Sequence, residues 1–289
     1  MPAANDVLIR PATPQDIPAC GKICYDAFST VNAEHNFPSD FPAPEAAQGV
    51  IAAMFSAPGF YCVVAESNNR ILGSNCLDER SMIRGVGPIT VDPNTQNRGV
   101  GRKLMDAVLD RSRERRAAGV RLVQAAFHNR SLSLYTSLGF DVREPLAVVQ
   151  GRTRERSVSG CTVRPATSAD LIACNALSYR VHGFDRGLDL GHSIQQGSAL
   201  VTERSGRITA YTSGLAFFGH TTAESNQDLQ ALLVSVDSFG GAGVLVPTRN
   251  AELFRWCLSN GLRVVEPMTL MSMGLYNEPR GAWLPSILF

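Results

Sequence analysis

The sequence predicts two tandem domains of the mixed α/β class. The chain has 289 residues, enough for one large domain or two ordinary ones. Strand-like and helix-like segments alternate along it, and one opening segment occurs twice. Hydrophobic residues make up 44% of the chain and charged residues 18%, which is typical of compact globular proteins and excludes disordered, collagen-like and coiled-coil chains.

The repeated opening defines the two copies. Arg10–Asp16 reads RPATPQD, and Arg164–Asp170 reads RPATSAD. In both copies a Thr precedes an Asp by three residues, a helix N-cap pattern, and apolar residues then follow at helical spacing. Residues 129–139 are echoed by 250–261. The polar segment Gln150–Ser157 has no apolar periodicity. We therefore expect a first domain over 1–150, a linker over 151–160 and a second domain over 161–289.

The elements of the first copy follow from periodicity and from turn residues. Helices are expected where apolar residues recur every three or four positions, and strands where short apolar or β-branched runs are bounded by Gly, Pro or Asn. We expect helices over 15–29, 45–55, 99–118 and 131–138, the third of them ended by Gly119, and strands over 7–10, 60–66, 70–77, 83–91, 121–127 and from Phe140.

Charge and composition exclude several classes of function. The 27 Lys and Arg and 26 Asp and Glu give a net charge of +1, so no nucleic-acid partner is expected, and Arg111–Arg121 is interleaved with acidic residues. No segment has the length of a membrane span, and the N-terminus does not resemble a signal sequence, so we expect a cytoplasmic protein without a membrane partner. The seven cysteines form no C-x-x-C pair and are expected to be reduced core residues. The five histidines are scattered, so no metal site is expected.

One strand-to-helix turn has the features of an anion site. After the strand that ends at Val91, Pro93 stops pairing, and residues 96–103 lead into a helix through Gly99 and Gly101. Free N–H groups at a helix start, the helix dipole and nearby basic side chains favour a diphosphate. The motif is neither G-x-G-x-x-G nor a nucleotide P-loop. The alternative is a glycine turn that only permits close packing.

Several motifs in one order resemble the GNAT superfamily of N-acetyltransferases. They are V-D-P at 91–93, Q-x-x-G-x-G at 96–101, Asn129, Tyr135 and L-G-F at 138–140. The resemblance covers most of the first copy and extends through the repeat to the second. It implies, for each copy, a mixed and mostly antiparallel sheet flanked by helices. It also implies acetyl-CoA as the cofactor, with CoA as product, and transfer of an acetyl or short acyl group to a primary amine.

The resemblance also implies the cofactor contacts. The pantetheine arm is expected to lie beside Ile89, Thr90 and Val91, and Gln96 to order the turn. Asn129 and Tyr135 are expected near the cofactor, although Asn129 is equally an N-cap candidate and Tyr135 a core aromatic. Backbone N–H groups are expected to bind the diphosphate at Arg98, Gly99, Val100, Gly101, Arg102 and Lys103.

The same resemblance implies the roles of the catalytic groups. Tyr135 is expected to give a proton to the departing thiolate. The strand over 83–91 carries no carboxylate that removes a proton from the ammonium group of the acceptor, so Asp78 and Glu79, just upstream, are the candidate bases, with solvated turn residues as the alternative. The missing carboxylate keeps a second function open, that of a catalytically silent acyl-CoA binder or sensor.

The second copy is expected to be degenerate. Its helix from Asn226 lacks the G-x-G pair, and Trp256 stands where Tyr135 stands in the first copy. The apolar tail over 281–289 is expected to be docked, either as a strand or core plug in the second copy or with the Phe289 carboxylate near the acceptor. The acceptor is a small-molecule amine or a protein amine, and the protein is a monomer or a homodimer.

Overall fold

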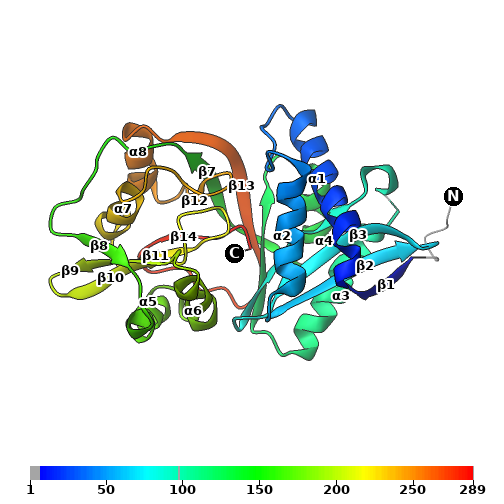
Figure 1. Ribbon diagram of the computed structural model, residues 1–289, viewed down its shortest axis with the longest axis horizontal. Coiled ribbons are helices and arrows are strands. Elements are labelled where there is room, and N and C mark those ends of the chain that lie inside the picture. Colours follow the sequence, from blue (N-terminus) through cyan, green and yellow to red (C-terminus); the bar gives the residue numbers. More distant parts are fainter. Residues whose placement is uncertain (1–6, 97, 289) are drawn as a thin grey trace. The chain divides into compact units, whose positions relative to one another are not determined.

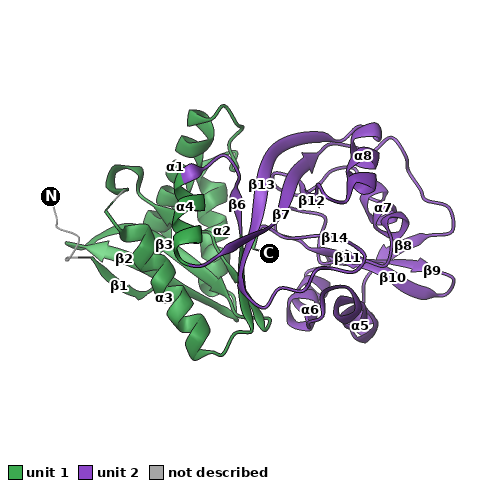
Figure 2. Ribbon diagram, turned by 180° about the vertical axis from the view of Figure 1, so that it is seen from behind, with its two compact units in different colours: residues 1–122, 130–138, 288 green, residues 123–129, 139–287, 289 purple. Residues whose placement is uncertain are grey.

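The computed structural model describes residues 7–96 and 98–288. They form two compact units that interleave along the sequence (Figure 2). Among these residues, unit 1 comprises 7–96, 98–122, 130–138 and 288, and unit 2 comprises 123–129 and 139–287. No helix within the described ranges is long and apolar enough to cross a membrane.

Unit 1 is built on a mixed sheet with the strand order β1-β2-β3-β4-β6, in which β5 also pairs with β3 (Figure 1). Neighbouring strands are antiparallel except β4 and β6, which are parallel. Most of these strands lie close to their expected places. Their bounds are β1 Leu8–Pro11, β2 Phe60–Ser67, β3 Arg70–Asp78, β4 Ile83–Val86, β5 Thr90–Val91 and β6 Gly119–Ala125.

The expected strand over 83–91 is two strands. β4 ends at Val86, and β5 begins at Thr90 after Gly87 and Pro88. Proline has no N–H to donate to a neighbouring strand, so the ladder is interrupted at Pro88. Ile89, expected to be part of the strand, lies between the two strands.

Helices cover both faces of the unit 1 sheet (Figure 1). α1 (Ile17–Glu34) and α2 (Pro44–Ser56) pack with Val64 of β2 in one apolar core, to which α1 contributes Cys20 and Cys24. α3 (Val100–Glu114) contacts β2 and β3 from the other face. The helix ends four residues earlier than expected. Arg116 adopts the left-handed conformation (φ 51°), and Gly119, expected as the cap, starts β6 instead.

The expectation that every cysteine is reduced is wrong for one pair. Cys62 of β2 and Cys76 of β3 are directly opposite in the antiparallel ladder, with Cα atoms 4.1 Å apart, and form a disulfide. The sequence distance of 14 residues gave no sign of this pairing, because it arises from the register of two strands. Cys20, Cys24, Cys174 and Cys257 are buried free thiols, as expected.

Unit 2 contains a five-stranded antiparallel sheet in the order β14-β11-β10-β9-β8. Figure 1 shows α5 and α6 beside it, and α7 packs on β9, β10 and β11. The bounds of its strands are β8 Thr162–Pro165, β9 Leu200–Arg204, β10 Arg207–Thr212, β11 Thr221–Ala223 and β14 Ala282–Leu284. The bounds of the helices are α5 Leu171–His182, α6 Gly187–Gln195, α7 Asn226–Val234 and α8 Ala251–Ser259.

A second group of strands in unit 2 includes the last strand of the first copy. β7 (Asp141–Gln150) lies between β12 (Val244–Pro247) and β13 (Arg263–Gly274) and is antiparallel to both. The compact units therefore divide the chain differently from the repeat in the sequence, whose first copy ends near residue 150. The reason is hydrogen bonding: β7 pairs with strands of the second copy over nearly its whole length.

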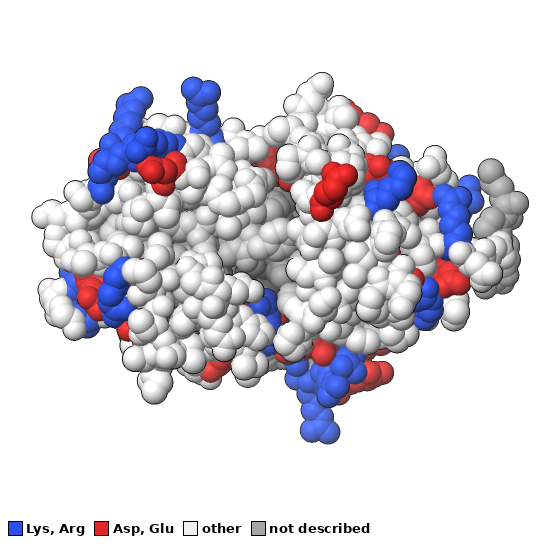
Figure 3. All heavy atoms as spheres, viewed as in Figure 1, with Lys and Arg blue, Asp and Glu red and all other residues white. Residues whose placement is uncertain are grey.

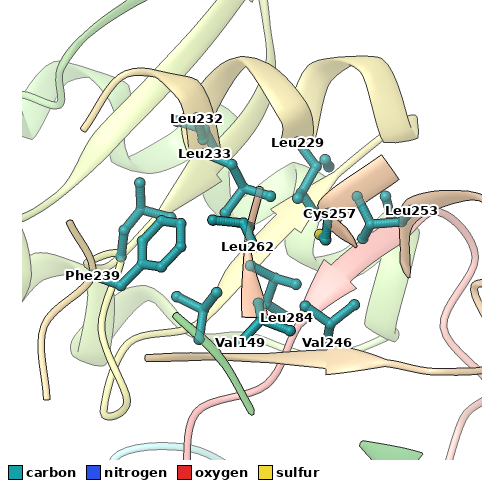
Figure 4. Close-up of a cluster of buried hydrophobic side chains, with 14 of the residues drawn as sticks. Val149, Leu229, Leu232, Leu233, Phe239, Val246, Leu253, Cys257, Leu262 and Leu284 are labelled. Carbon is teal, nitrogen blue, oxygen red and sulfur yellow. The ribbon is translucent and has the colours of Figure 1, made fainter. Parts of the chain in front are cut away.

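The core of unit 2 joins these two groups of strands. Figure 4 shows apolar side chains of α7 and α8, among them Leu229, Leu233 and Leu253, converging on Val149 of β7 and Val246 of β12. The tail contributes to the same core. β14 pairs with β11, and Leu284 is buried, so the expected docking of this segment as a strand is confirmed for residues 282–284. Phe289 lies outside the described residues.

The repeated opening forms the same network in both units. In unit 1 the Arg10 guanidinium donates twice to Asp16 at 2.8 Å and once to Glu66 at 2.7 Å. In unit 2 Arg164 donates twice to Asp170, at 2.8 Å, and twice to Glu203, at 2.9 and 2.6 Å. Each aspartate also accepts from the N–H and the hydroxyl of the threonine three residues before it, Thr13 or Thr167, and so caps the turn. The Arg10 hydrogen bonds lower the pKa of Asp16 to about 2, against the effect of burial.

Candidate functional site

The central strands of unit 1 separate beside β5. The parallel pairing of β4 with β6 covers residues 83–85 and 119–121, and β5, which continues the line of β4, pairs with β3. Gly73 of β3 lets β5 approach closely, since a Cβ atom there would collide with the Thr90 carbonyl oxygen. Thr90 and Val91 therefore lie on a short strand that is fixed to β3 and has left the line of β6.

A short connection joins β5 to α3. Asp92 follows β5 and accepts a hydrogen bond from the Asn94 N–H at 2.9 Å, which caps a 3-10 turn over Pro93–Thr95. The side-chain amide of Gln96 donates to the Val91 carbonyl at 3.5 Å, and its oxygen accepts from Arg130 of α4 (Asn129–Ser137) at 2.8 Å. Gln96 thus contacts both the end of β5 and the first turn of α4.

The glycine turn has the geometry of an anion site. Gly99 has φ 78° and ψ 0°, a left-handed conformation that favours glycine, and an added Cβ would meet no atom within 4 Å. Gly101 faces Leu134, with ordinary packing distance for a Cβ. The first helical bond of α3 runs from the Lys103 N–H to the Gly99 carbonyl. The N–H groups before Lys103 therefore point out of the helix at its positive end.

Basic side chains surround this helix start. Arg102 donates to Ser137 Oγ at 2.5 Å, and the Lys103 ammonium group donates to the Val7 carbonyl at 3.3 Å. Arg98 is half-buried in the turn itself. Elsewhere charges are mixed: on the face drawn in Figure 3, acidic groups accompany many of the Lys and Arg groups. The local excess of positive charge at residues 98–103 suits a diphosphate.

The structure places the two residues expected near the cofactor on one helix. Asn129 is the first residue of α4 and is exposed, and the boundary between the compact units falls directly after it. Tyr135, on the same helix, belongs to unit 1 and is buried, with 6% of its surface exposed. Burial raises the pKa of the Tyr135 phenol well above its ordinary value of about 10. The phenol therefore keeps its proton at neutral pH.

Both candidate bases are held by arginines. Asp78 is buried at the end of β3 and accepts from Arg80 at 2.9 and 2.6 Å. Glu79 accepts from Arg111 of α3 at 2.9 and 3.1 Å. Arg111 in turn lies over the ring of Tyr61. Each carboxylate thus has a local structural partner, which the sequence alone did not reveal.

At the corresponding helix start in unit 2, that of α7, a buried aspartate of the helix itself occupies the space. Asp228, in the first turn of α7, has no exposed surface and accepts from Arg204 at 2.8 and 3.0 Å and from Thr209 at 2.7 Å. The N-cap Ser225 also donates to it. An aspartate in the first turn of a predicted helix, near a strand with basic residues, was the signal in the sequence that could have indicated this arrangement.

Within residues 7–96 and 98–288, no three His, Cys, Asp or Glu side chains are grouped so as to hold a metal ion. Trp256, which takes the place of Tyr135 in the second copy, is half-buried on α8 and packs against the core of unit 2.

Comparison with known proteins agrees with this geometry. Residues 58–142, which include β5, the glycine turn and Tyr135, match the family model of the acetyltransferase (GNAT) domain. No characterised protein matches the chain significantly by sequence.

Solved structures with the same fold cover nearly the whole chain. A candidate acetyltransferase from Pyrococcus horikoshii is 19% identical with a TM-score of 0.71, covering 96% of this chain and 94% of that one. A GCN5-related N-acetyltransferase from Sphaerobacter thermophilus is 15% identical with a TM-score of 0.61, covering 96% and 98%. A GCN5-related glucosamine N-acetyltransferase region of a fungal multi-domain β-N-acetylglucosaminidase is 12% identical with a TM-score of 0.60, covering 94% of this chain and 38% of that one. The chain therefore has the GNAT fold, and residues 58–142 match the acetyltransferase (GNAT) domain.

Proposed function

We propose that unit 1 transfers an acetyl or short acyl group from acetyl-CoA to a primary amine. The observation that carries the proposal is the start of α3, where Gly99 begins a basic helix N-terminus that one short connection joins to the separated strand β5. A helix start with exposed N–H groups suits the diphosphate of CoA, and a strand with unsatisfied backbone groups suits its amide-containing pantetheine arm. Ile89, Thr90 and Val91 would hold the arm, and residues 98–103 the diphosphate.

The transfer is proposed as direct attack in a ternary complex. The neutral amine attacks the thioester carbonyl carbon, and a backbone N–H near Val91 stabilises the resulting oxyanion. The carbon–sulfur bond then breaks, the nitrogen releases one proton to water as the new amide forms, and the thiolate takes the proton of Tyr135. The raised pKa of Tyr135 keeps this proton in place until a thiolate is there to accept it. Solvent restores the phenol proton in the next cycle.

The proton of the acceptor ammonium must leave before attack. Asp78 and Glu79 are proposed as the bases, either directly or through water, but each is bound by an arginine. A carboxylate that is paired with an arginine is a weaker base. The two ion pairs therefore favour the second candidate function, an acyl-CoA binder or sensor without turnover. Variants Asp78→Asn and Glu79→Gln distinguish the two: a base is needed only for turnover, so loss of turnover with unchanged affinity for acetyl-CoA supports the enzyme.

Calorimetry with acetyl-CoA, combined with an assay of thiol release over a panel of amines, tests the proposal. The panel should contain amino acids, polyamines, a lysine peptide and glucosamine, the last because one structural relative is a glucosamine N-acetyltransferase. Binding with thiol release in the presence of one amine supports the enzyme. Binding without release for every amine supports the sensor, and absence of binding contradicts both.

A further inference from the structure

An ion pair ties together the strand that precedes the glycine turn and its neighbour. Arg70, the first residue of β3, is paired with Asp92, the residue that follows β5. The Asp92 N–H also donates to the Leu72 carbonyl at 2.8 Å. The Arg70 side chain is 61% exposed and that of Asp92 only 9%, so the guanidinium covers the carboxylate from the solvent side.

Asp92 also fixes the start of the connection to α3. One carboxylate oxygen accepts from the Asn94 N–H and side-chain amide at 2.9 and 3.0 Å, and the other accepts from Arg70. The Asp92 carbonyl accepts from the N–H and hydroxyl of Thr95 at 2.8 and 3.1 Å. Burial alone would raise the pKa of Asp92, but the Asn94 hydrogen bonds and the Arg70 charge lower it.

The second copy contains the same pair without the glycine turn. Arg207, the first residue of β10, pairs with Glu224 at 2.6 Å, and the Glu224 N–H donates to the Thr209 carbonyl at 2.9 Å. The Arg207 side chain is 58% exposed, nearly the same as Arg70. There the helix α7 begins directly after the cap Ser225. The two arginines are alike in place and exposure, but Glu224 also pairs with Arg180 at 3.0 Å. The two pairs differ further in the segment that leads from each pair to its helix.

We propose that Arg70 is a positioning residue for the diphosphate of acetyl-CoA, acting through Asp92. This inference rests on the proposed function. The N–H groups of the glycine turn can bind a diphosphate only if the turn is held at a fixed distance from β5, where the pantetheine arm would lie. Asp92 anchors the start of the connection, whereas the bond from Gln96 to Val91 farther along is long. Arg70 keeps the Asp92 carboxylate turned toward Asn94.

The variants Arg70→Met and Arg207→Met provide a matched test. Both remove one largely exposed guanidinium at the equivalent place and keep a long aliphatic side chain, and in Arg207→Met the carboxylate of Glu224 keeps Arg180 as a partner. We expect Arg70→Met to weaken acetyl-CoA binding about three- to fivefold, the range of an exposed ion pair, with kcat within about twofold. Arg207→Met should leave the affinity unchanged, and both variants should lower the melting temperature only slightly. Asp92→Asn should reproduce the effect of Arg70→Met, and the double variant Arg70→Met, Asp92→Asn should add little to either.

Amide hydrogen exchange separates failure of this inference from failure of the proposed function. Faster exchange at the hydrogen-bonded N–H groups of Asn94, Thr95 and Lys103 in Arg70→Met, and not in Arg207→Met, supports positioning whether or not acetyl-CoA is the ligand. If the parent binds acetyl-CoA and Arg70→Met binds it equally well, the inference is wrong and the proposed function stands. Unchanged exchange at these three N–H groups, or an equal loss of affinity in Arg207→Met, also overturns it. Absence of binding by the parent counts against the proposed function alone.

Discussion

The starts of α3 and α7 show two solutions to the same problem. Each helix follows the end of a strand and presents N–H groups without helical partners. α3 begins with the left-handed Gly99 and is surrounded by basic side chains, with open space before the glycine. α7 begins at the capped Asn226, and the buried Asp228 carboxylate takes up the positive potential. The start of α3 has space for an anion from outside the chain, whereas the start of α7 already contains the Asp228 carboxylate.

The difference teaches that the fold alone does not determine cofactor binding. At α7 the Ser225 hydroxyl accepts from the Asp228 N–H, and the buried Asp228 carboxylate places a negative charge at the positive end of the helix. Asp228 also neutralises Arg204 of the neighbouring strand, so the basic group that would attract a phosphate is used internally. We therefore expect acetyl-CoA to bind once per chain, at α3.

The largest expected effect comes from closing the α3 site. In the double variant Gly99→Val, Gly101→Val, a β-branched residue cannot adopt φ 78° without strain, and side chains fill the space before the N–H groups. We expect acetyl-CoA binding to fall below detection by calorimetry, with the far-ultraviolet circular dichroism spectrum unchanged.

Gly99→Asn is the control for this variant. Asn tolerates the left-handed conformation better than Val, and its Cβ would meet no atom within 4 Å. It should therefore keep more affinity than Gly99→Val. If both single variants lose binding equally, steric blocking and not backbone conformation decides. If the double variant still binds normally, the site lies elsewhere.

The next effect is on turnover. Tyr135→Phe removes a buried hydroxyl and keeps the packed ring, so we expect turnover to fall by about a hundredfold to ten-thousandfold with acetyl-CoA affinity nearly unchanged. Trp256→Phe, at the corresponding place in the second copy, should leave turnover unchanged. A Tyr135→Phe enzyme within twofold of the parent would mean that the hydroxyl is structural or that thiolate release is not limiting.

Removing the buried Asp228 carboxylate should lower the stability of the fold and leave the binding of acetyl-CoA unchanged. Asp228→Ala leaves Arg204 and Thr209 without their shared partner, and we expect a loss on the order of 2–3 kcal/mol in the free energy of unfolding. Chemical denaturation measures this loss, and calorimetry should still give one acetyl-CoA per chain. Two equivalents bound by the variant would mean that Asp228 is what excludes the second cofactor.

The smallest effect is one that both units should share. Because the pKa of Asp16 is lowered to about 2, the ionised form stabilises the fold. This contribution is complete above about pH 5, is lost as the pH falls through about 2, and amounts to about 2 kcal/mol. The pKa of Asp170 is lowered in the same way by Arg164. Urea unfolding at several pH values should show a shallower acid slope for Asp16→Asn and, to a similar extent, for Asp170→Asn.

Much of the fold followed from the sequence because local signals and packing agree. The capping pairs Thr13 with Asp16 and Thr167 with Asp170 predicted two helix starts that the structure contains. The apolar residues along one face of α3, and the Gly and Pro residues that interrupt the other helices and strands, predicted the bounds of most elements of unit 1 to within a few residues of those in the structure. The open glycine turn at Gly99 was also expected from its residue types.

The features that the sequence did not reveal depend on contacts between distant residues. The Cys62–Cys76 disulfide follows from strand register, and the arginine partners of Asp78 and Glu79 follow from how β3 and α3 pack. The end of α3 at Glu114 was missed because a left-handed Arg116, and not the predicted Gly119, ends the helix. Asp228 looked like an ordinary first-turn residue until Arg204 and Thr209 were placed beside it.

The position of β7 sets an order of events for a chain that emerges from the ribosome. β7 is made before β12 and β13, the two strands that flank it. Its backbone groups must remain unpaired, or bound by a chaperone, until nearly the whole chain has been synthesised. A chain shortened to residues 161–289 would keep β12 and β13 but have a gap between them. Such a fragment would present two free strand edges, the kind of surface from which aggregation begins.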